Sequence, residues 1–238
     1  MNLQFAAIKR RLLPLRAVSL LVLLVCTGCT GKTPEEWDKE YFDSQVAAIK
    51  AGNGDSVDLY DVQGSDALLH SIAGLKGVKR VSIQQMNDIT KKGVEDIAAL
   101  PDLTALALYQ IEITDEWLKL FHGSARLEDL DLTPWQPCDF NIATVLALPH
   151  LRKLHLDVDV YVDPGNPDAD KAERWVDSTL QGLKDAKSLK ELRLTGSVFV
   201  KRKQDLALLQ KELPDCEIKL FEAQGKGDPP QIPLTQNE

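Results

Sequence analysis

The sequence predicts an α/β solenoid of about seven short parallel strands, backed by helices and preceded by an N-terminal capping helix. Similar short apolar segments recur along most of the 238 residues, which indicates a repeated strand. Most of these segments are followed by residues with helical periodicity. A helix-start signal stands just before the first copy and supplies the cap.

Residues 1–28 are predicted to be an export signal and not part of the fold. They contain four cations and no acid, and an uncharged apolar run follows the cations at 17–25. This run is too short to cross a membrane, which takes about 20 apolar residues. Without the segment the chain has 24 basic and 36 acidic side chains, a net charge of -12 in place of -8. Such an acidic chain is not expected to bind nucleic acid.

The end of this segment, Cys26-Thr27-Gly28-Cys29, resembles a bacterial lipoprotein signal, in which small residues precede a cysteine that becomes acylated. The resemblance implies cleavage before Cys29, palmitate-type chains on that residue, and a place in the cell envelope. Thr30, where Asp would retain the protein at the inner membrane, implies the outer membrane, with a periplasmic or surface-exposed body. Cys26 departs from the usual aliphatic residue, so an ordinary signal peptide or an uncleaved anchor is the alternative.

Residues 29–53 are predicted to be a short tether followed by the capping helix. Thr33-Pro34-Glu35-Glu36 places Thr at the N-cap, Pro at the first helical position and Glu three residues after the Thr. Apolar residues then recur at helical spacing, and Gly52-Asn53-Gly54 ends the run. The short tether would keep the folded body close to the bilayer.

Beyond Gly54 the chain repeats itself. The clearest copies have the form Leu-x-x-Leu-x-Leu at 103–108, 127–132, 151–156 and 189–194, with weaker copies around Val57, Val81 and Ile218. Their middle apolar positions are separated by 24, 25, 24, 24, 38 and 26 residues. Each copy predicts a short strand with its leucines facing the core. Stacked neighbours bury the leucines that one unit cannot bury alone.

This pattern resembles the leucine-rich-repeat family over residues 54–222. The similarity is closest to the helix-backed subtypes typified by ribonuclease inhibitor and the cysteine-containing repeats. Ile113-Thr114-Asp115 matches their turn after the strand, and Ile89-Thr90 matches its first half. No ladder of asparagines follows the strands, and the turn motif fades in the later copies. The resemblance implies a concave parallel sheet with helices on the convex side.

Two segments depart from the repeat. The 38-residue step contains an insertion at about 157–171, with oxygen-bearing side chains at Asp157, Asp159, Asp163, Asn166, Asp168 and Asp170. Calcium prefers such ligands, but their spacing is not that of an EF-hand, so a solvated acidic loop is predicted and calcium binding is the alternative. Residues 223–238, rich in Gly, Pro and Gln, are expected to form a disordered tail.

Two cysteines remain in the predicted folded body. The repeat register places Cys138 in the apolar position that Ile89 and Ile113 hold after their strands, and Cys216 in a position that is Leu in other copies. Three rungs separate the two cysteines, about 14 Å at the usual interstrand spacing. A disulfide requires Cα atoms within about 7 Å. Two buried free thiols are therefore expected.

The same register assigns polar side chains to the concave face, because neighbours along a strand point to opposite sides. Asp131, His155 and Arg193 are expected in one row, with Asp129, Lys153 and Glu191 in the row beside it. Their alternating signs are expected to pair. The candidate binding residues are Tyr60, Tyr109, Asp129, Asp131, Lys153, His155, Asp157 and Arg193.

These features predict a membrane-anchored leucine-rich-repeat lipoprotein whose concave face binds a protein or another envelope component. No Ser or Cys nucleophile is expected in the row of Asp131 and His155, so no catalytic residue is assigned and no enzyme activity, metal or cofactor is expected. One alternative is a structural envelope protein without a specific ligand, favoured if the concave charges satisfy one another. Another is a metal-dependent enzyme that uses the acidic insertion.

Overall fold

The computed structural model describes residues 33–61, 65–86, 88–134, 140–158, 167–222, 231–232 and 234. The chain divides into residues 1–37 and residues 38–238, and the fold described below is that of the second unit. No helix within the described residues is both long and apolar enough to cross a membrane. The predicted export signal, Cys29 included, lies outside the described residues.

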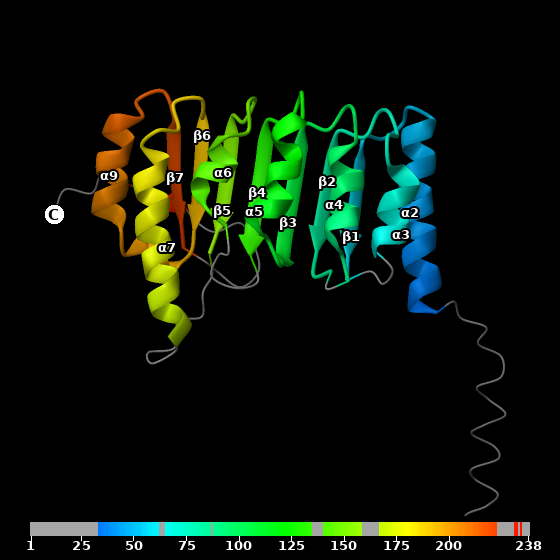
Figure 1. The fold of residues 1–238 in the computed structure, drawn as a ribbon, viewed down its shortest axis with the longest axis horizontal. Helices are drawn as coiled ribbons and strands as arrows, with labels where there is room; N and C mark the ends of the chain where they lie inside the picture. Colours follow the sequence, from blue (N-terminus) through cyan, green and yellow to red (C-terminus); the bar gives the residue numbers. More distant parts are fainter. Residues whose placement is uncertain are drawn as a thin grey trace, which may run out of the picture. The chain divides into compact units, whose positions relative to one another are not determined.

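Helices and strands alternate along the chain (Figure 1). The strands are β1 (Ser56–Tyr60), β2 (Arg80–Gln84), β3 (Ala105–Ile111), β4 (Asp129–Pro134), β5 (Lys153–Asp157), β6 (Glu191–Thr195), β7 (Glu217–Phe221) and β8 (Gln231–Ile232). The helices are α2 (Pro34–Lys50), α3 (Ser65–Ile72), α4 (Lys91–Ala98), α5 (Asp115–Lys119), the 3-10 helix η2 (Leu120–Gly123), α6 (Ile142–Leu146), α7 (Pro167–Leu183), α8 (Ser197–Val200) and α9 (Lys203–Glu212).

The strands form one sheet in the order β1 to β8. The first seven are parallel, each paired with its neighbour in sequence, which confirms the seven predicted strands. Helices cover one face of this sheet (Figure 1). The middle apolar positions of the repeat stand side by side across the sheet, at Val57, Val81, Leu106, Leu130, Leu154, Leu192 and Ile218.

The core lies between the sheet and its helices. Leu130, Leu154 and Leu192 are at most 1% exposed, and they share one apolar cluster with helix residues such as Ile97 and Val176. Burying each such side chain contributes about 1.5–3 kcal/mol. The leucine spacing thus fixes which face of every strand meets the helices.

The N-terminal helix α2 protects the edge of the sheet. Phe42 and Ile49 belong to the core cluster. The Gln45 side chain accepts a hydrogen bond from the backbone N–H of Asp58 at 2.7 Å and donates one to its carbonyl at 3.0 Å. Backbone groups of an edge strand otherwise stay open to another strand, so α2 acts as a cap, as predicted.

The turn after the strand also follows the predicted pattern. Ile89 and Ile113 are buried. Thr90 is the N-cap of α4 and accepts from the backbone N–H of Lys92, while Thr114 is the N-cap of α5. The isoleucine therefore fastens the turn to the core, and the threonine satisfies a free N–H of the helix start.

The third such turn corrects the predicted place of Cys138. Asn141 is the N-cap of α6, and the buried residue directly before it is Phe140. Phe140 thus holds the position that the repeat register assigns to Cys138, which itself lies outside the described residues. Two extra residues in this turn shift the register. Cys216 is a free, buried cysteine, as predicted.

The two departures from the repeat differ from their predictions in part. Residues 167–171 of the predicted insertion belong to α7, and Val158 is buried. Residues 159–166 lie outside the described residues. Within the predicted disordered tail, Gln231 and Ile232 pair antiparallel with β7. Residues 223–230 and 235–238 lie outside the described residues.

Candidate functional site

We call the side of the sheet away from the helices the open face. It is formed by the strand residues that alternate with the core leucines, and the predicted rows are aligned there. Asp131 stands beside His155, and His155 beside Arg193. In the adjacent row Asp129 stands beside Lys153, and Lys153 beside Glu191. The register predicted from the repeat is therefore confirmed.

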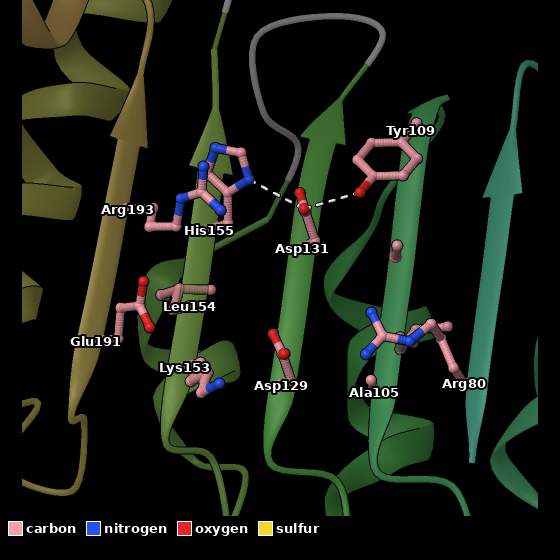
Figure 2. Close-up of a pocket in the computed structure, with 12 residues that line it drawn as sticks. Arg80, Ala105, Tyr109, Asp129, Asp131, Lys153, Leu154, His155, Glu191 and Arg193 are labelled. Atoms are coloured by element: carbon pink, nitrogen blue, oxygen red, sulfur yellow. Dashed lines mark hydrogen bonds and ion pairs between the residues drawn. The ribbon is translucent and has the colours of Figure 1, made fainter. Parts of the chain in front are cut away.

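A hollow of about 190 Å³, which we call the Ala105 hollow, lies on the open face across β2 to β6 (Figure 2). Ala105 and Ala107 line it with short side chains, whereas the neighbouring strands carry long ones. Six of the predicted binding residues line the hollow together, namely Tyr109, Asp129, Asp131, Lys153, His155 and Arg193. Arg80 and Glu191 complete its charged wall.

A chain of hydrogen bonds runs along one side of the hollow. The Tyr109 hydroxyl donates to Asp131 Oδ2 at 2.8 Å, and His155 Nδ1 lies 3.0 Å from the same oxygen (Figure 2). His155 Nε2 lies 2.9 Å from Thr195 Oγ1. Because an ionised carboxylate only accepts, the neutral ring carries its proton on Nδ1 and accepts from the Thr195 hydroxyl at Nε2. Both ring nitrogens are thus engaged, which fixes the orientation of His155.

The same carboxylate affects the tyrosine. Burial raises the pKa of Tyr109 well above its usual range, and the negative charge of Asp131 raises this pKa further. The phenol therefore stays protonated and remains a donor to Asp131. Losing that donor would leave Asp131 with fewer partners, since Asp131 Oδ1 is already buried without a hydrogen bond to any described group.

The atom order Thr195–His155–Asp131 is that of a hydrolase triad, in which His stands between a hydroxyl and a carboxylate. A nucleophile must reach the substrate, yet Thr195 is 5% exposed and is not among the residues that line the hollow. The hydrogen-bonded chain therefore supports an orienting role for Thr195 and gives no basis for assigning it as a nucleophile.

Asp129 is a half-buried carboxylate between two cations that it does not contact. Burial raises its pKa, while the nearby charges of Lys153 and Arg80 lower this pKa in part. Figure 2 shows the Arg80 guanidinium extending across β3 toward Asp129. Among the described residues, Asp129 forms no ion pair or hydrogen bond with either cation.

Two further charged residues of the hollow, Glu191 and Arg193, contact residues of β7. Lys219 of β7 lies 3.0 Å from Glu191 Oε1 and 3.0 Å from Glu217 Oε2. This contact lowers the pKa of Glu191 and raises the pKa of Lys219. The Arg193 guanidinium lies 5.0 Å from the centre of the Phe221 ring, a cation–π contact.

The predicted pairing of alternating charges is therefore correct for Asp131 and His155 only. Asp129 and Lys153 do not pair, and Glu191 pairs with Lys219 on the other side instead of Lys153. Glu191 pairs outside its row because Lys219 of β7 reaches its carboxylate. Arg80 and Asp129 stand two strands apart, about 10 Å between Cα atoms, with the uncharged Ala105 between them. The chain matches no family model and no curated protein.

Two predicted binding residues do not line the hollow. Tyr60 stands on β1 with 59% of its surface exposed. Asp157 ends β5 on the open face and has an interaction partner of its own. Cys29, the predicted lipidation site, lies outside the described residues.

Three residues of the site were missing from the predicted list of binding residues. Arg80 and Glu191 stand in the same row as Asp129 and Lys153, and the predicted register already placed Glu191 in that row. The contact of Thr195 with His155 could not be found in this way, because the Thr195 side chain reaches His155 diagonally, from one row further along the strand.

Metal binding finds no support in the part of the chain that the structure describes. No group of three or more His, Cys, Asp or Glu side chains is arranged there to hold a metal ion. The centre of the predicted acidic loop, for which calcium binding is the alternative, is residues 159–166 and lies outside these ranges.

Proposed function

We propose that this protein is a membrane-anchored leucine-rich-repeat lipoprotein whose open face binds a protein of the cell envelope. The repeat assignment is supported by seven parallel strands in sequence order and by the buried isoleucine and capping threonine after β2 and β3. The proposed membrane anchoring in the cell envelope is supported by the lipoprotein-like sequence that ends at Cys29.

The observation that carries the binding role is the state of the charges in the Ala105 hollow. Arg80, Asp129 and Lys153 form no ion pair with any described residue, although all three line one depression. A sheet surface that serves only solubility is expected to pair its charges across strands. Unpaired charges instead gain by contact with a partner of complementary charge. This favours a binding module over a structural spacer.

The binding role is tested by covalent cross-linking in intact envelopes, followed by purification of the full chain. We expect a defined protein cross-linked to the wild type and lost in the double variant Arg80→Glu, Lys153→Glu. The matched control is Arg174→Glu, because Arg174 is an exposed arginine on α7, on the helical side of the sheet. A partner that is retained by the double variant would refute binding at the hollow.

The proposed lipid anchoring at Cys29 is tested separately by mass spectrometry of the mature N-terminus. We expect cleavage before Cys29 and a mass increase equal to the attached acyl chains. In the variant Cys29→Ser, the protein should leave the membrane fraction. An unmodified N-terminus at another residue would refute the lipoprotein assignment and leave the binding role of the open face unaffected.

A further inference from the structure

The Ala105 hollow brings together charges of both signs, and some of them form no ion pair with any described residue. Asp131 accepts from Tyr109 and contacts His155, and Glu191 pairs with Lys219, so these carboxylates are already engaged. Four other charged residues line the hollow: Arg80, Lys153 and Arg193 are positive, and Asp129 is negative. None of the four forms an ion pair with a described residue.

This set of charges determines what the hollow can hold. A simple anion placed beside Arg80 and Lys153 would leave Asp129 unpaired and would be repelled by it. A simple cation placed beside Asp129 would meet three positive charges. Only a ligand that carries an ammonium group and carboxylates satisfies both signs, and the excess of positive charge favours two carboxylates over one.

The size of the hollow sets a second limit. Its volume of about 190 Å³ lies below the roughly 300–1,000 Å³ of pockets for drug-sized ligands. Arg80 and Lys153 stand on β2 and β5, three strands or about 14 Å apart between their Cα atoms, and Figure 2 shows the Arg80 guanidinium over β3. A chain of five carbons with a charge-assisted hydrogen bond of about 2.8 Å at each end covers a span of this order.

We propose that the Ala105 hollow binds a small amino dicarboxylate, a free amino acid of the glutamate or aspartate class. Its ammonium group lies against Asp129, and its two carboxylates lie against Arg80 and Lys153. Arg193, held in place over Phe221, adds positive charge at the far side. Tyr109 and His155 form the rim beside Asp131. This small-molecule site goes beyond the proposed protein partner and requires neither that partner nor the lipid anchor.

The test is calorimetric titration of the full chain in detergent with three compounds. Glutamate carries all three charges, glutarate lacks the ammonium group, and glutamine has one carboxylate replaced by an amide. We expect glutamate to bind at least about tenfold more tightly than either of the others, the loss typical for one charge-assisted hydrogen bond. The proposal would be overturned if glutamate did not bind at concentrations on the order of 10 mM, or if glutamate and glutarate bound with equal affinity.

Variants then assign the two ends of the ligand. Asp129→Asn should bring the affinities for glutamate and glutarate together, because the residue that selects the ammonium group is gone. Arg80→Ala should weaken glutamate about tenfold or more. The matched controls are Asp215→Asn, before β7, and Arg174→Ala on α7, both exposed and outside the hollow. Unchanged selectivity in Asp129→Asn would contradict the proposed orientation.

The outcome is distinguishable from that of the cross-linking experiment. If glutamate fails to bind while the envelope partner is lost in the double variant, the small-molecule site is refuted and the protein-binding role stands. If glutamate binds and the partner is retained, the reverse holds. Thermal unfolding of each variant shows that it is folded, so that loss of binding is not a loss of structure.

Discussion

Asp66 of one repeat caps the helix start of the next, since its Oδ1 accepts a hydrogen bond from the backbone N–H of Thr90 at 2.9 Å. The Thr90 hydroxyl donates to the other oxygen of the same carboxylate. Asp115 makes the equivalent contact two repeats later, accepting from the backbone N–H of Asn141 at 2.9 Å. Successive repeats are thus joined by polar contacts as well as by the leucine core.

Gly93 makes room for the Asp66 carboxylate. A Cβ at this position would lie 2.3 Å from Asp66 Oδ1 and 3.0 Å from Leu69 Cδ1. Gly93→Ala therefore displaces a side chain held by two hydrogen bonds, at a cost of about 1–3 kcal/mol, partly offset by about 1 kcal/mol of helix propensity. We expect a lower urea midpoint with an unchanged slope. Gly123→Ala is the control, because an added Cβ there meets nothing within 4 Å, and an equal effect in both variants would contradict this explanation.

Asp129→Asn should make the protein more stable at neutral pH. Burial raises the pKa of Asp129 in the folded state above its value of 3.8 in the unfolded chain, so folding favours the protonated form. The penalty for the charged form is present above the raised pKa and disappears as pH falls below 3.8. The excess stability of the variant should therefore be present at pH 7 and absent near pH 3, as measured by urea unfolding at both values. A variant less stable than the wild type at pH 7 would show that Asp129 is paired in the folded protein.

The sequence was sufficient for the register of the open face and insufficient for its contacts. The leucine period aligns Asp129 with Lys153 and Asp131 with His155. Once the leucines of neighbouring strands are paired, the residues on either side of them are paired as well, on the opposite face of the sheet. Which charges pair depends on side-chain reach and on neighbours from outside the row. Lys219 on β7 forms an ion pair with Glu191, and the uncharged Ala105 stands between Arg80 and Asp129 in the row.

The Cys138 register fails for a related reason. Each strand is located by its own leucine motif, whatever the length of the loop before it. A position inside a turn is located only by counting from the strand, so a change in turn length shifts it. The turn that ends in Phe140 and Asn141 is two residues longer than the turn that ends in Ile89 and Thr90, and nothing in the leucine pattern records that difference.

The Cys216 thiol should react slowly in the folded protein. Burial raises its pKa to about 11, and it is 3% exposed. The thiolate is the reactive form, so at pH 8 only about one thiol in a thousand is available even where reagent can reach it. Iodoacetamide labelling of the Cys216 peptide, followed by mass spectrometry, should be at least a hundredfold slower in buffer than in 8 M-range urea. Similar rates in both conditions would mean that the β7 end of the sheet opens readily.

The ion pair between Glu191 and Lys219 should stabilise the fold over a defined pH range. The hydrogen bond from Lys219 lowers the pKa of Glu191 below its usual 4.5, and the same contact raises the pKa of Lys219 above 10.5. The contribution of Glu191 is present above pH 4.5 and is lost as pH falls through the lowered value, while that of Lys219 is lost as pH rises past the raised value. The variant Glu191→Gln should thus be less stable than the wild type at pH 7, by at most about 1 kcal/mol because the pair is partly solvated.

The difference between Glu191→Gln and the wild type should shrink toward zero near pH 2–3 in urea unfolding, because the wild-type carboxyl is then protonated as well. The control is Glu217→Gln, which removes the more exposed acid bound to Lys219, with 65% of its side chain in solvent. Its effect at pH 7 should be the smaller of the two. A larger loss in Glu217→Gln would show that Lys219 serves mainly to hold the edge of β7 and not to neutralise Glu191.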